Sequence, residues 1–518
     1  MELRTKLGQM VCIGFDGLMP PQEILDLIRT HKIGNISLYA HNFKNKQQAL
    51  ELVTFLKKYI YMETGLIPFI SVDQEGGMVT RFSQDFTHFP GAMATAATGD
   101  AENAFRIGYY SGLEIKNAGL NASFAPVVDI NTNSKNPVIG VRAYGDTAEA
   151  VTTYAMRMLD GLEKVGVLSM LKHFPGHGDT FQDSHFALPR VDKTLDQLFE
   201  MELKPYIEGI RRGAPAIMTS HIVFPNIDPS GLPATMSKVI IHDLLREKLH
   251  FEGIIRSDDL EMEAIRREFG ILPGALAAVK AGVDIVSVSR SPALGGELVE
   301  LLENQIASGE LDEALIDASF LRIVKCKERY CQDGSPDLDV IGCDAHREIA
   351  REISRHSVAL LRDPRNQLPV KGKVLVVSTN AFNQTNVRNP LQLELSMPTL
   401  MSKRLGGEGI TIAIEPTSEQ CNQVLAAAVN ADTVVFGTYN AHIFRGQLEL
   451  ASQLVKAHPN VIFVAMRNPY DLPLLDPDCA ALAAYEYTPV SIETLGDILT
   501  GKHNALGSIC VKLDTPES

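Results

Sequence analysis

The residues best suited to chemistry stand at positions 172–185, which read KHFPGHGDTFQDSH. This stretch holds three histidines, one lysine and two aspartates in fourteen positions, interrupted by two glycines and a proline. Such interruptions disfavour a regular helix and are typical of a loop. Because an apolar run ends at Leu171, the cluster begins where a strand would end. In barrels of parallel strands, catalytic residues sit in the loops that follow the strands.

Two groups of residues in such loops can act together. Asp183 and His185 are one residue apart, so in an extended segment both side chains face the same side. A carboxylate beside an imidazole fixes its tautomer and raises its pKa toward neutrality. Asp258 and Asp259 end another apolar run. On one face of a barrel, these groups would supply the nucleophile and the acid/base of a covalent mechanism. The alternative is a surface Asp and His without partners.

The sequence alone leaves open which of the two adjacent aspartates would be the nucleophile. Successive side chains of a strand face opposite ways. We therefore expect only one of Asp258 and Asp259 to face a ligand.

Eight short apolar runs, separated by longer amphipathic segments, would position these residues. They are Met10–Phe15, Ile33–Ala40, Pro68–Asp73, Ala122–Ile130, Val167–Phe174, Ala216–Ile222, Gly253–Asp259 and Asp284–Arg290. Eight units of this kind predict a (β/α)8 barrel. Several runs end in polar side chains, which either form a site or merely cap strands: Asp73, Asp129, Lys172, His173, His221, Asp258 and Arg290.

A second unit is expected beyond a polar connector, YCQDGSPDLDVIGCD at 330–344. We predict a catalytic barrel over 1–330, a linker over 331–345 and a smaller open α/β sandwich over 346–518. The second unit has five apolar runs: Val374–Thr379, Thr411–Glu415, Thr433–Tyr439, Val461–Arg467 and Ala480–Tyr487. No G-x-G-x-x-G or Walker-type loop follows them, which argues against a nucleotide site there.

The composition excludes several classes of protein. The 518 residues carry 63 acidic and 48 basic side chains, a net charge of −15, so nucleic acid and anionic membranes are not expected partners. Seven cysteines without a C-x-x-C pair indicate reduced thiols. There is no apolar run of membrane-spanning length and no signal-peptide pattern at the start. We expect a cytoplasmic protein, either a monomer or a weak oligomer.

Four motifs in order carry a resemblance to a known family. They are SVDQEGG with Arg81 after it, NPVIGVRAYGD, KHFPGHGDTFQDSH and LLREKLHFEGIIRSDDLEM. Together they resemble glycoside hydrolase family 3, in its β-N-acetylglucosaminidase branch of the NagZ type. The connector and second unit resemble the two-domain form found in Gram-positive bacteria.

The resemblance implies a role for individual residues. Asp258 matches the nucleophile, and His185 matches the acid/base, with Asp183 orienting it. Residues that match sugar-binding positions are Asp73, Arg81, Arg142, Lys172, His173 and His221. His177 and Asp179 are expected to tie the loop together. Arg256 departs from the family pattern, which has an apolar residue there, and a buried charge at this position would need a partner.

These roles imply a retaining exo-β-N-acetylglucosaminidase that uses no metal and no organic cofactor. Asp258 would form a covalent glycosyl-enzyme, which water then opens. Its substrate would be a terminal N-acetylglucosamine of muropeptides or chitin fragments. Inorganic phosphate could replace water, because a neutral imidazole does not repel an anion, so a phosphorylase is an alternative.

Three other interpretations of the function or mechanism stay open. The first is a zinc amidohydrolase with ligands from His173, His177, His185 and Asp258, although Pro175 and Gly176 break the helical spacing of the first two. The second is a sugar-binding protein without catalysis. The third is assistance by the acetamido group of the substrate. Arg445, in the loop YNAHIFRG, is a candidate for a contact from the second unit to the pocket, but a surface arginine is the simpler interpretation.

Overall fold

The structure is a computed structural model that describes residues 1–181, 188–332, 334–381 and 395–513. Its first sheet has eight strands, all parallel, in the order β4-β3-β2-β1-β8-β7-β6-β5. Each of the eight predicted runs contains one of these strands, so the predicted series is confirmed. The strands are β1 (Val11–Ile13), β2 (Asn35–Leu38), β3 (Phe69–Val72), β4 (Ala122–Ser123), β5 (Leu171–Phe174), β6 (Ala216–Thr219), β7 (Ile254–Asp259) and β8 (Ile285–Val288).

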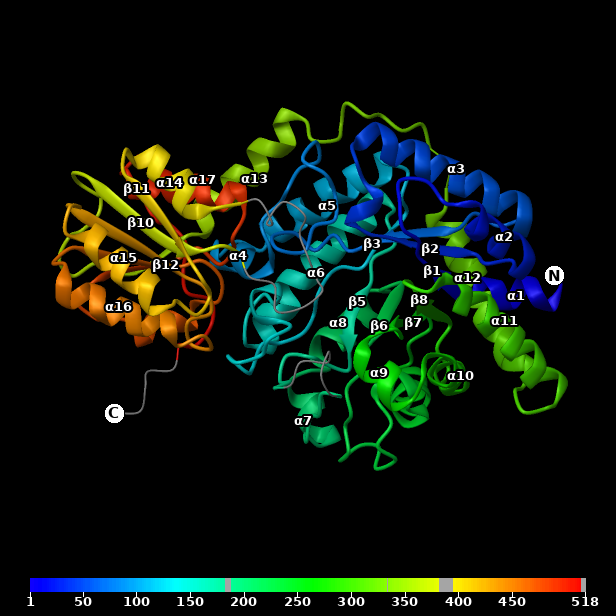
Figure 1. Cartoon of the computed structure of the whole chain (residues 1–518). Helices are drawn as coiled ribbons and strands as arrows, with labels where there is room; N and C mark the ends of the chain where they lie inside the picture. The colour runs from blue at the N-terminus through cyan, green and yellow to red at the C-terminus, as the bar shows by residue number, and fades with distance from the viewer. Residues whose placement is uncertain (182–187, 333, 382–394, 514–518) are drawn as a thin grey trace.

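The sheet closes into a barrel between β4 and β5. Isolated parallel bridges join Ala122 to Leu168 and Val127 to Lys172. The backbone N–H of Ser123 donates to the Leu168 carbonyl, and that of Val128 donates to the Lys172 carbonyl, both at 2.8 Å. The predicted barrel is therefore confirmed (Figure 1).

Helices surround the barrel, and local sequence signals set their ends. The Asn45 side chain accepts from the Gln48 N–H at the start of α3, and Gly65, with φ of +74°, ends that helix. The main surrounding helices are α1 (Leu3–Gln9), α2 (Gln22–His31), α3 (Lys46–Thr64), α5 (Glu102–Asn117), α6 (Ala148–Val165), α8 (Lys204–Arg211), the π-helix η4 (Val239–Lys248), α10 (Ile271–Ala281), α11 (Pro292–Ala307) and α12 (Glu313–Tyr330). Shorter helices in the loops are α4 (Ala92–Ala97), α7 (Leu195–Glu200) and α9 (Glu263–Glu268).

The second sheet has the order β11-β10-β12-β13-β14-β9, in which only β9 is antiparallel to its neighbour. Its strands are β9 (Ala359–Arg362), β10 (Val374–Thr379), β11 (Glu408–Ile412), β12 (Thr433–Thr438), β13 (Val461–Ala465) and β14 (Ala480–Ala483). Its helices are α13 (Asp344–Ser357), α14 (Met397–Leu405), α15 (Ser418–Ala428), α16 (Gly446–Ala457) and α17 (Pro489–Leu499). All five predicted strands are present, β11 three residues earlier than expected. The analysis missed β9, an edge strand in which Leu360 and Leu361 are exposed.

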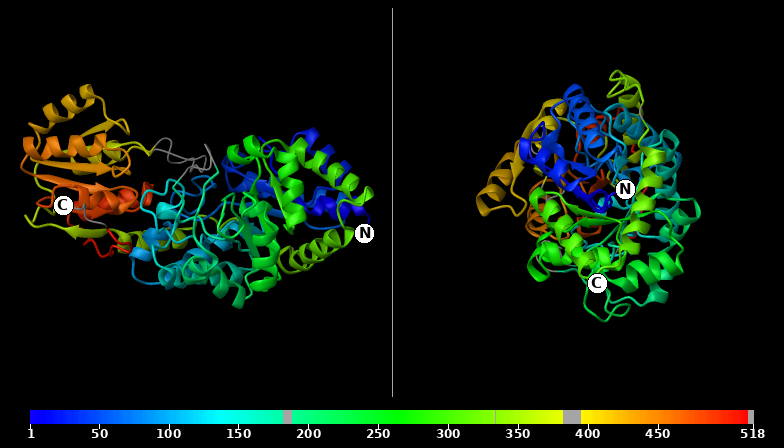
Figure 2. Two further views of the ribbon diagram at one scale, coloured as in Figure 1. Left: turned by 90° about the horizontal axis from the view of Figure 1, so that it is seen from below. Right: turned by 90° about the vertical axis from the view of Figure 1, so that its right-hand side faces the viewer.

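The two sheets share apolar packing. Met78, Val79, Met93 and Val141 come from loops of the barrel, yet they belong to the same buried cluster as Phe436 of the second sheet. Figure 2 shows the two units side by side along the long axis of the molecule. α12 ends at Tyr330 and α13 begins at Asp344, and the domain boundaries between them remain predictions. Within the described ranges, no helix is long and apolar enough to cross a membrane.

Candidate active site

A pocket of about 150 Å³ lies at the carboxyl ends of the barrel strands. It is the place where the chemistry of such barrels is found. Most of its lining residues are polar or charged, and they come from β2, β5, β6, β7 and β8 and from the loops that follow β2, β3, β4, β5, β7 and β8. The lining residues that carry charge or an imidazole are Asp73, Glu75, Arg81, Arg142, Lys172, His173, His177, Arg256, Asp258, Asp259 and Arg290.

One side of the pocket is a network of two carboxylates and three cations. Asp73, at the end of β3, accepts from Lys172 Nζ at 3.0 Å and from Arg81 Nη2 at 3.1 Å. Glu75 accepts from Arg142 through Nε at 2.9 Å and Nη2 at 2.8 Å, and its Oε1 lies 2.5 Å from Lys172 Nζ. The structure thus brings together Asp73, Arg81, Arg142 and Lys172, all predicted as sugar-binding residues.

Glu75 also lines the pocket but was not singled out from the sequence. Burial alone would raise its pKa, but the charges of Arg142 and Lys172 overcome this effect and lower the pKa to about 2. The same balance keeps the pKa of Asp73 well below its usual range, with Lys172 and Arg81 as the opposing charges. Both carboxylates are therefore ionised near neutral pH. The spacing from Asp73 could have pointed to Glu75. It lies two residues later, and side chains two residues apart on an extended segment share a face.

A third carboxylate, Asp129, binds His173 in β5 and His177 in the loop that follows it. His173 Nδ1 donates to Asp129 at 2.7 Å, and the backbone N–H of His177 donates to the same carboxylate at 2.7 Å. Burial alone would raise the pKa of Asp129, but His173 and these hydrogen bonds lower it. Burial, followed by the neighbouring His173, lowers the pKa of His177 to about 4. His177 is thus neutral at pH 7, and its Nδ1 lies 2.8 Å from the Thr180 hydroxyl.

Both aspartates at the end of β7 line the pocket. The expectation that only one of them faces a ligand stays a prediction. The register between β7 and β8 shifts between Arg256 and Asp259, which breaks strict alternation. Asp258 Oδ1 accepts from the Asp259 N–H at 2.8 Å, and Asp259 Oδ1 accepts from the Glu261 N–H at 3.0 Å. Burial, with smaller contributions from the charges of Glu261 and Asp258, raises the pKa of Asp259 to about 6.

His221 lies next to the pocket but is not part of its lining. Its Nε2 donates to the Asp259 carbonyl at 3.1 Å, and its Nδ1 lies 2.9 Å from the Thr235 hydroxyl. Burial lowers its pKa. In this position His221 supports the backbone of Asp259, and its contact with a sugar remains a prediction.

Arg256, the departure from the family pattern, is 2% exposed and extends into the barrel below Asp258. It donates to Ser37 Oγ at 2.8 Å, to Ser287 Oγ at 3.1 Å and to Cys12 Sγ at 3.0 Å. Its guanidinium carbon lies 4.5 Å from the centre of the Phe124 ring. These neutral groups and the aromatic face, rather than an ion pair among the described residues, satisfy the buried charge.

The predicted acid/base pair, Asp183 and His185, lies outside the residues that the structure describes. Asp179, four residues before Asp183, pairs with Lys193 at 3.1 Å and accepts from the Thr132 hydroxyl at 3.1 Å. Arg445, the candidate from the second unit, precedes α16 and does not line the pocket. Within the described ranges, no group of three or more His, Cys, Asp or Glu side chains is arranged to hold a metal ion.

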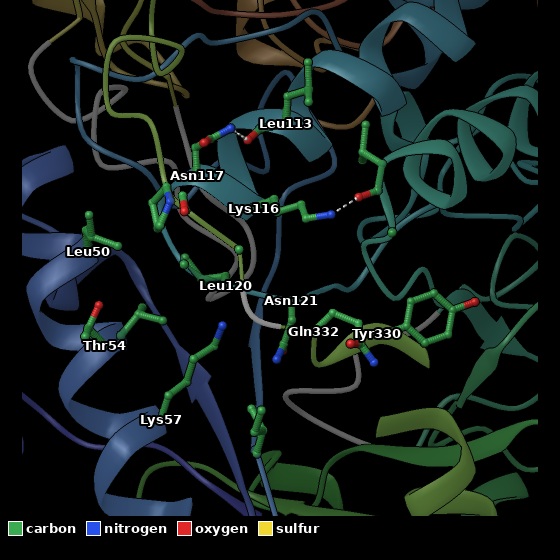
Figure 3. A pocket seen from close by; sticks show the side chains of 18 of the residues that line it. Leu50, Thr54, Lys57, Leu113, Lys116, Asn117, Leu120, Asn121, Tyr330 and Gln332 are labelled. Atoms are coloured by element: carbon green, nitrogen blue, oxygen red, sulfur yellow. Dashed lines mark hydrogen bonds between the residues drawn. The ribbon is translucent and has the colours of Figure 1, made fainter. Parts of the chain in front are cut away.

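A larger pocket, of about 830 Å³, lies elsewhere on the barrel, between α3, α5 and the connector after α12 (Figure 3). Its described lining contains Lys57, Lys116 and Tyr330 but no carboxylate. Lys116 Nζ donates to the Val165 carbonyl at 2.8 Å, and Asn117 donates to the Leu113 carbonyl. This pocket includes Asn121 at the start of β4 and none of the strand-end residues, so the smaller pocket is the candidate active site.

Comparison with known proteins places the chain in a family. The model of the glycosyl hydrolase family 3 N terminal domain matches residues 2–326. Beta-hexosaminidase A of Pseudoalteromonas piscicida is 33% identical over 389 residues, which are 69% of this chain but only 64% of that protein. A beta-hexosaminidase of Neisseria meningitidis serogroup C is 37% identical over 276 residues, 52% of this chain and 74% of that protein.

A solved structure matches the whole chain. A glycoside hydrolase family 3 beta-N-acetylglucosaminidase from Paenibacillus sp. FPU-7 is 35% identical, with a TM-score of 0.93 and complete coverage of both chains. The family model covers the barrel, and this neighbour also covers the second sheet. This chain belongs to glycosyl hydrolase family 3.

Proposed function

We propose that this protein is a retaining exo-β-N-acetylglucosaminidase that removes terminal N-acetylglucosamine from cell-wall muropeptides or chitin fragments. The observation that carries the proposal is the position of Asp258 in one small pocket with the network of Asp73, Glu75, Arg81, Arg142 and Lys172. Fixed carboxylates and cations are suited to binding neighbouring sugar hydroxyls, because each hydroxyl both donates and accepts hydrogen bonds. The pocket volume favours a single terminal sugar.

The chemistry would proceed in two steps. Asp258 attacks the anomeric carbon, while protonated His185 donates its proton to the leaving oxygen and Asp183 orients the imidazole. This step breaks the glycosidic bond and forms an ester between Asp258 and the sugar. Neutral His185 then takes a proton from water, which attacks the anomeric carbon and releases the sugar with its configuration retained.

The choice of Asp258 over Asp259 rests on the family resemblance, in which the first aspartate of the pair matches the nucleophile. A pKa of about 6 leaves Asp259 mostly ionised at pH 7, so its charge does not separate the two. Each carboxylate also accepts one backbone N–H. Covalent labelling therefore decides between them.

Phosphorolysis is the second candidate function, and the charge of the pocket favours it. Five basic side chains, Arg81, Arg142, Lys172, Arg256 and Arg290, face four acidic ones, Asp73, Glu75, Asp258 and Asp259. Ester formation removes the charge of Asp258 and leaves two excess positive charges. Inorganic phosphate would then be attracted to the glycosyl-enzyme as acceptor.

One set of measurements tests these proposals. We expect wild-type protein to release nitrophenol from p-nitrophenyl β-N-acetylglucosaminide and to give the β-anomer first. A 2-fluoro sugar should label Asp258 covalently. Without such an adduct in an active sample, assistance by the acetamido group would replace our mechanism. N-acetylglucosamine 1-phosphate as the main product in phosphate buffer would favour the phosphorylase, and activity that disappears on chelation would favour a metal enzyme.

We also propose that the protein acts in the cytoplasm as a monomer or weak oligomer, on a small amino-sugar substrate. All seven cysteines are free thiols, three of them buried, which fits a reducing compartment. Recycling of wall fragments would supply such substrates. Cell fractionation and size-exclusion chromatography test these two points.

A further inference from the structure

We propose that Glu486, from the loop after β14 in the second unit, is a positioning residue for the Glu75–Arg142 pair of the active site. The inference deepens the proposed function, because it assumes that this pair binds the sugar. It also gives the second unit a role in catalysis, although none of its described side chains lines the pocket.

Glu486 extends from the second unit into the barrel loops. It is 3% exposed, and its Oε2 accepts from the backbone N–H of Gly91 at 2.8 Å. Its Oε1 accepts from the Thr488 hydroxyl at 3.2 Å. In the described part of the chain, no basic side chain pairs with it, which is unusual for a buried carboxylate. An amide N–H from the loop between β3 and α4 is therefore its main contact with the barrel.

The turn that Glu486 touches is packed so closely that a shift of Glu486 would move it. Gly77 has φ of +55°, and a Cβ built on it would lie 2.8 Å from both Glu486 Oε2 and the Cα of Gly91. Its N–H donates to the Phe89 carbonyl at 2.8 Å. Only glycine fits at this position, because any side chain would meet the carboxylate and the opposite backbone at once.

This turn begins directly after Glu75. A narrow cavity behind the pocket is lined by Glu75, Gly76, Gly91, Arg142 and Glu486 together. Because Glu75 holds Arg142 by two hydrogen bonds and also contacts Lys172, a small movement of the turn changes the position of all three side chains. A misplacement of about 1 Å is enough to cost an enzyme much of its efficiency.

The second unit also supports the loop that carries Arg142. Asn131 donates to the Tyr470 hydroxyl at 2.8 Å, and Asn131 in turn accepts from the Gly140 N–H at 3.0 Å. His442 Nε2 donates to the Ser134 carbonyl at 3.0 Å. Both members of the Glu75–Arg142 pair are thus on loops that the second unit contacts, but only Glu486 brings a titratable carboxylate to the turn beside Glu75.

Burial raises the pKa of Glu486 to about 7, whereas the bonds from Gly91 and Thr488 act in the opposite direction. The other titratable or charged side chains that line the same cavity are Glu75, Arg142, Tyr144 and Tyr485. Glu75 is ionised and Arg142 is cationic over the whole neutral range, so only Glu486 changes charge there. A carboxylate binds the Gly91 N–H more strongly than a neutral carboxyl does, so the turn is held more firmly above pH 7.

The test compares Glu486→Gln and Glu486→Ala with wild-type protein, and Glu493→Gln, an exposed glutamate of α17, serves as the matched control. We expect the KM for p-nitrophenyl β-N-acetylglucosaminide at pH 8 to rise about fivefold in Glu486→Gln, with kcat within about twofold. In wild-type protein KM should fall as pH rises through 7. In Glu486→Gln this dependence should disappear, which a purely structural role would not produce.

A double-mutant cycle with Glu75→Gln completes the test. If Glu486 acts through Glu75, adding Glu486→Gln to Glu75→Gln should raise KM no further. Unchanged KM in both Glu486 variants, or fully additive effects in the cycle, would overturn the inference. If wild-type protein shows no turnover, the proposed function fails by itself. In that case the free energies of unfolding of the two single variants and the double variant test whether Glu486 and Glu75 are coupled. Additive losses would contradict the coupling.

Discussion

Replacing Glu75 by glutamine should test the site network most directly. The change keeps the shape of the side chain but removes the charge that faces Arg142 and Lys172. The pKa of Glu75 is about 2 against an ordinary value of 4.5. This lowering of the pKa corresponds to about 3 kcal/mol of stability at pH 7. Loss of one partner of a buried ion pair costs about 3–5 kcal/mol in other proteins. We therefore expect Glu75→Gln to lose about 3 kcal/mol.

The pH dependence of this loss follows from the lowered pKa. The Glu75 contribution is nearly complete above pH 5 and declines as pH falls toward 2, because the unfolded state then binds a proton that the folded state does not. Between wild-type protein and Glu75→Gln, the difference in free energy of unfolding should be about 3 kcal/mol at pH 7 but only about 1 kcal/mol at pH 3. Urea unfolding followed by circular dichroism measures it.

Glu352→Gln provides the control for this experiment. Glu352 pairs with Arg106 at 2.7 Å, but its side chain is 49% exposed. An exposed pair of this kind contributes about 0–1 kcal/mol. A loss below about 1 kcal/mol for Glu75→Gln, or a difference that stays constant from pH 7 to pH 3, would refute the assignment of Glu75 as the buried partner of Arg142 and Lys172.

Three further predictions concern other carboxylates. Asp258→Asn should lower kcat by about 10³-fold or more while the protein stays folded, which nitrophenol release and circular dichroism report together; retained turnover would remove Asp258 as nucleophile. Asp129→Asn should lower the free energy of unfolding by about 2 kcal/mol and raise KM, because His173 and His177 lose a charged acceptor. Thermal unfolding and steady-state kinetics measure the two effects, and a variant equal to wild type in both would contradict the role of Asp129. Glu486→Gln should be more stable than wild type at pH 8 but nearly equal to it at pH 5. Because the pKa of Glu486 is raised to about 7, ionised Glu486 destabilises the folded state increasingly as pH rises from 4.5 to above 7. Urea unfolding at both pH values measures the difference in stability, and an equal difference at the two would contradict a buried carboxylate.

The strands of the barrel could be predicted because their environment is uniform. Parallel strands are buried on both faces, so a run such as 10–15 is continuously apolar and is followed at once by a charged residue, Asp16. β9 gives no such signal, since it is a four-residue edge strand whose central leucines face solvent. The burial pattern of a strand thus decides whether it can be read from the sequence.

Which residues line the site could be predicted better than which of them form ion pairs with one another. Asp73, Arg142 and Lys172 were expected in the pocket and are there. That Lys172 would pair with Asp73, 99 positions earlier, and with Glu75 depends on how the strands are placed around the barrel, which no local pattern encodes. The register shift between Arg256 and Asp259, at the end of β7 that lines the pocket, is equally invisible in the sequence.

The apolar cluster shared by the two units has a practical consequence. The family model ends at residue 326, so a chain shortened to the barrel is an obvious choice for expression. Such a protein would expose Met78, Val79, Met93 and Val141 to water, since their packing partners include the strands of the second sheet. Contiguous apolar patches of this kind promote self-association. A stand-alone barrel would therefore need these positions exchanged for polar residues before its solubility or its kinetics could be compared with those of the intact enzyme.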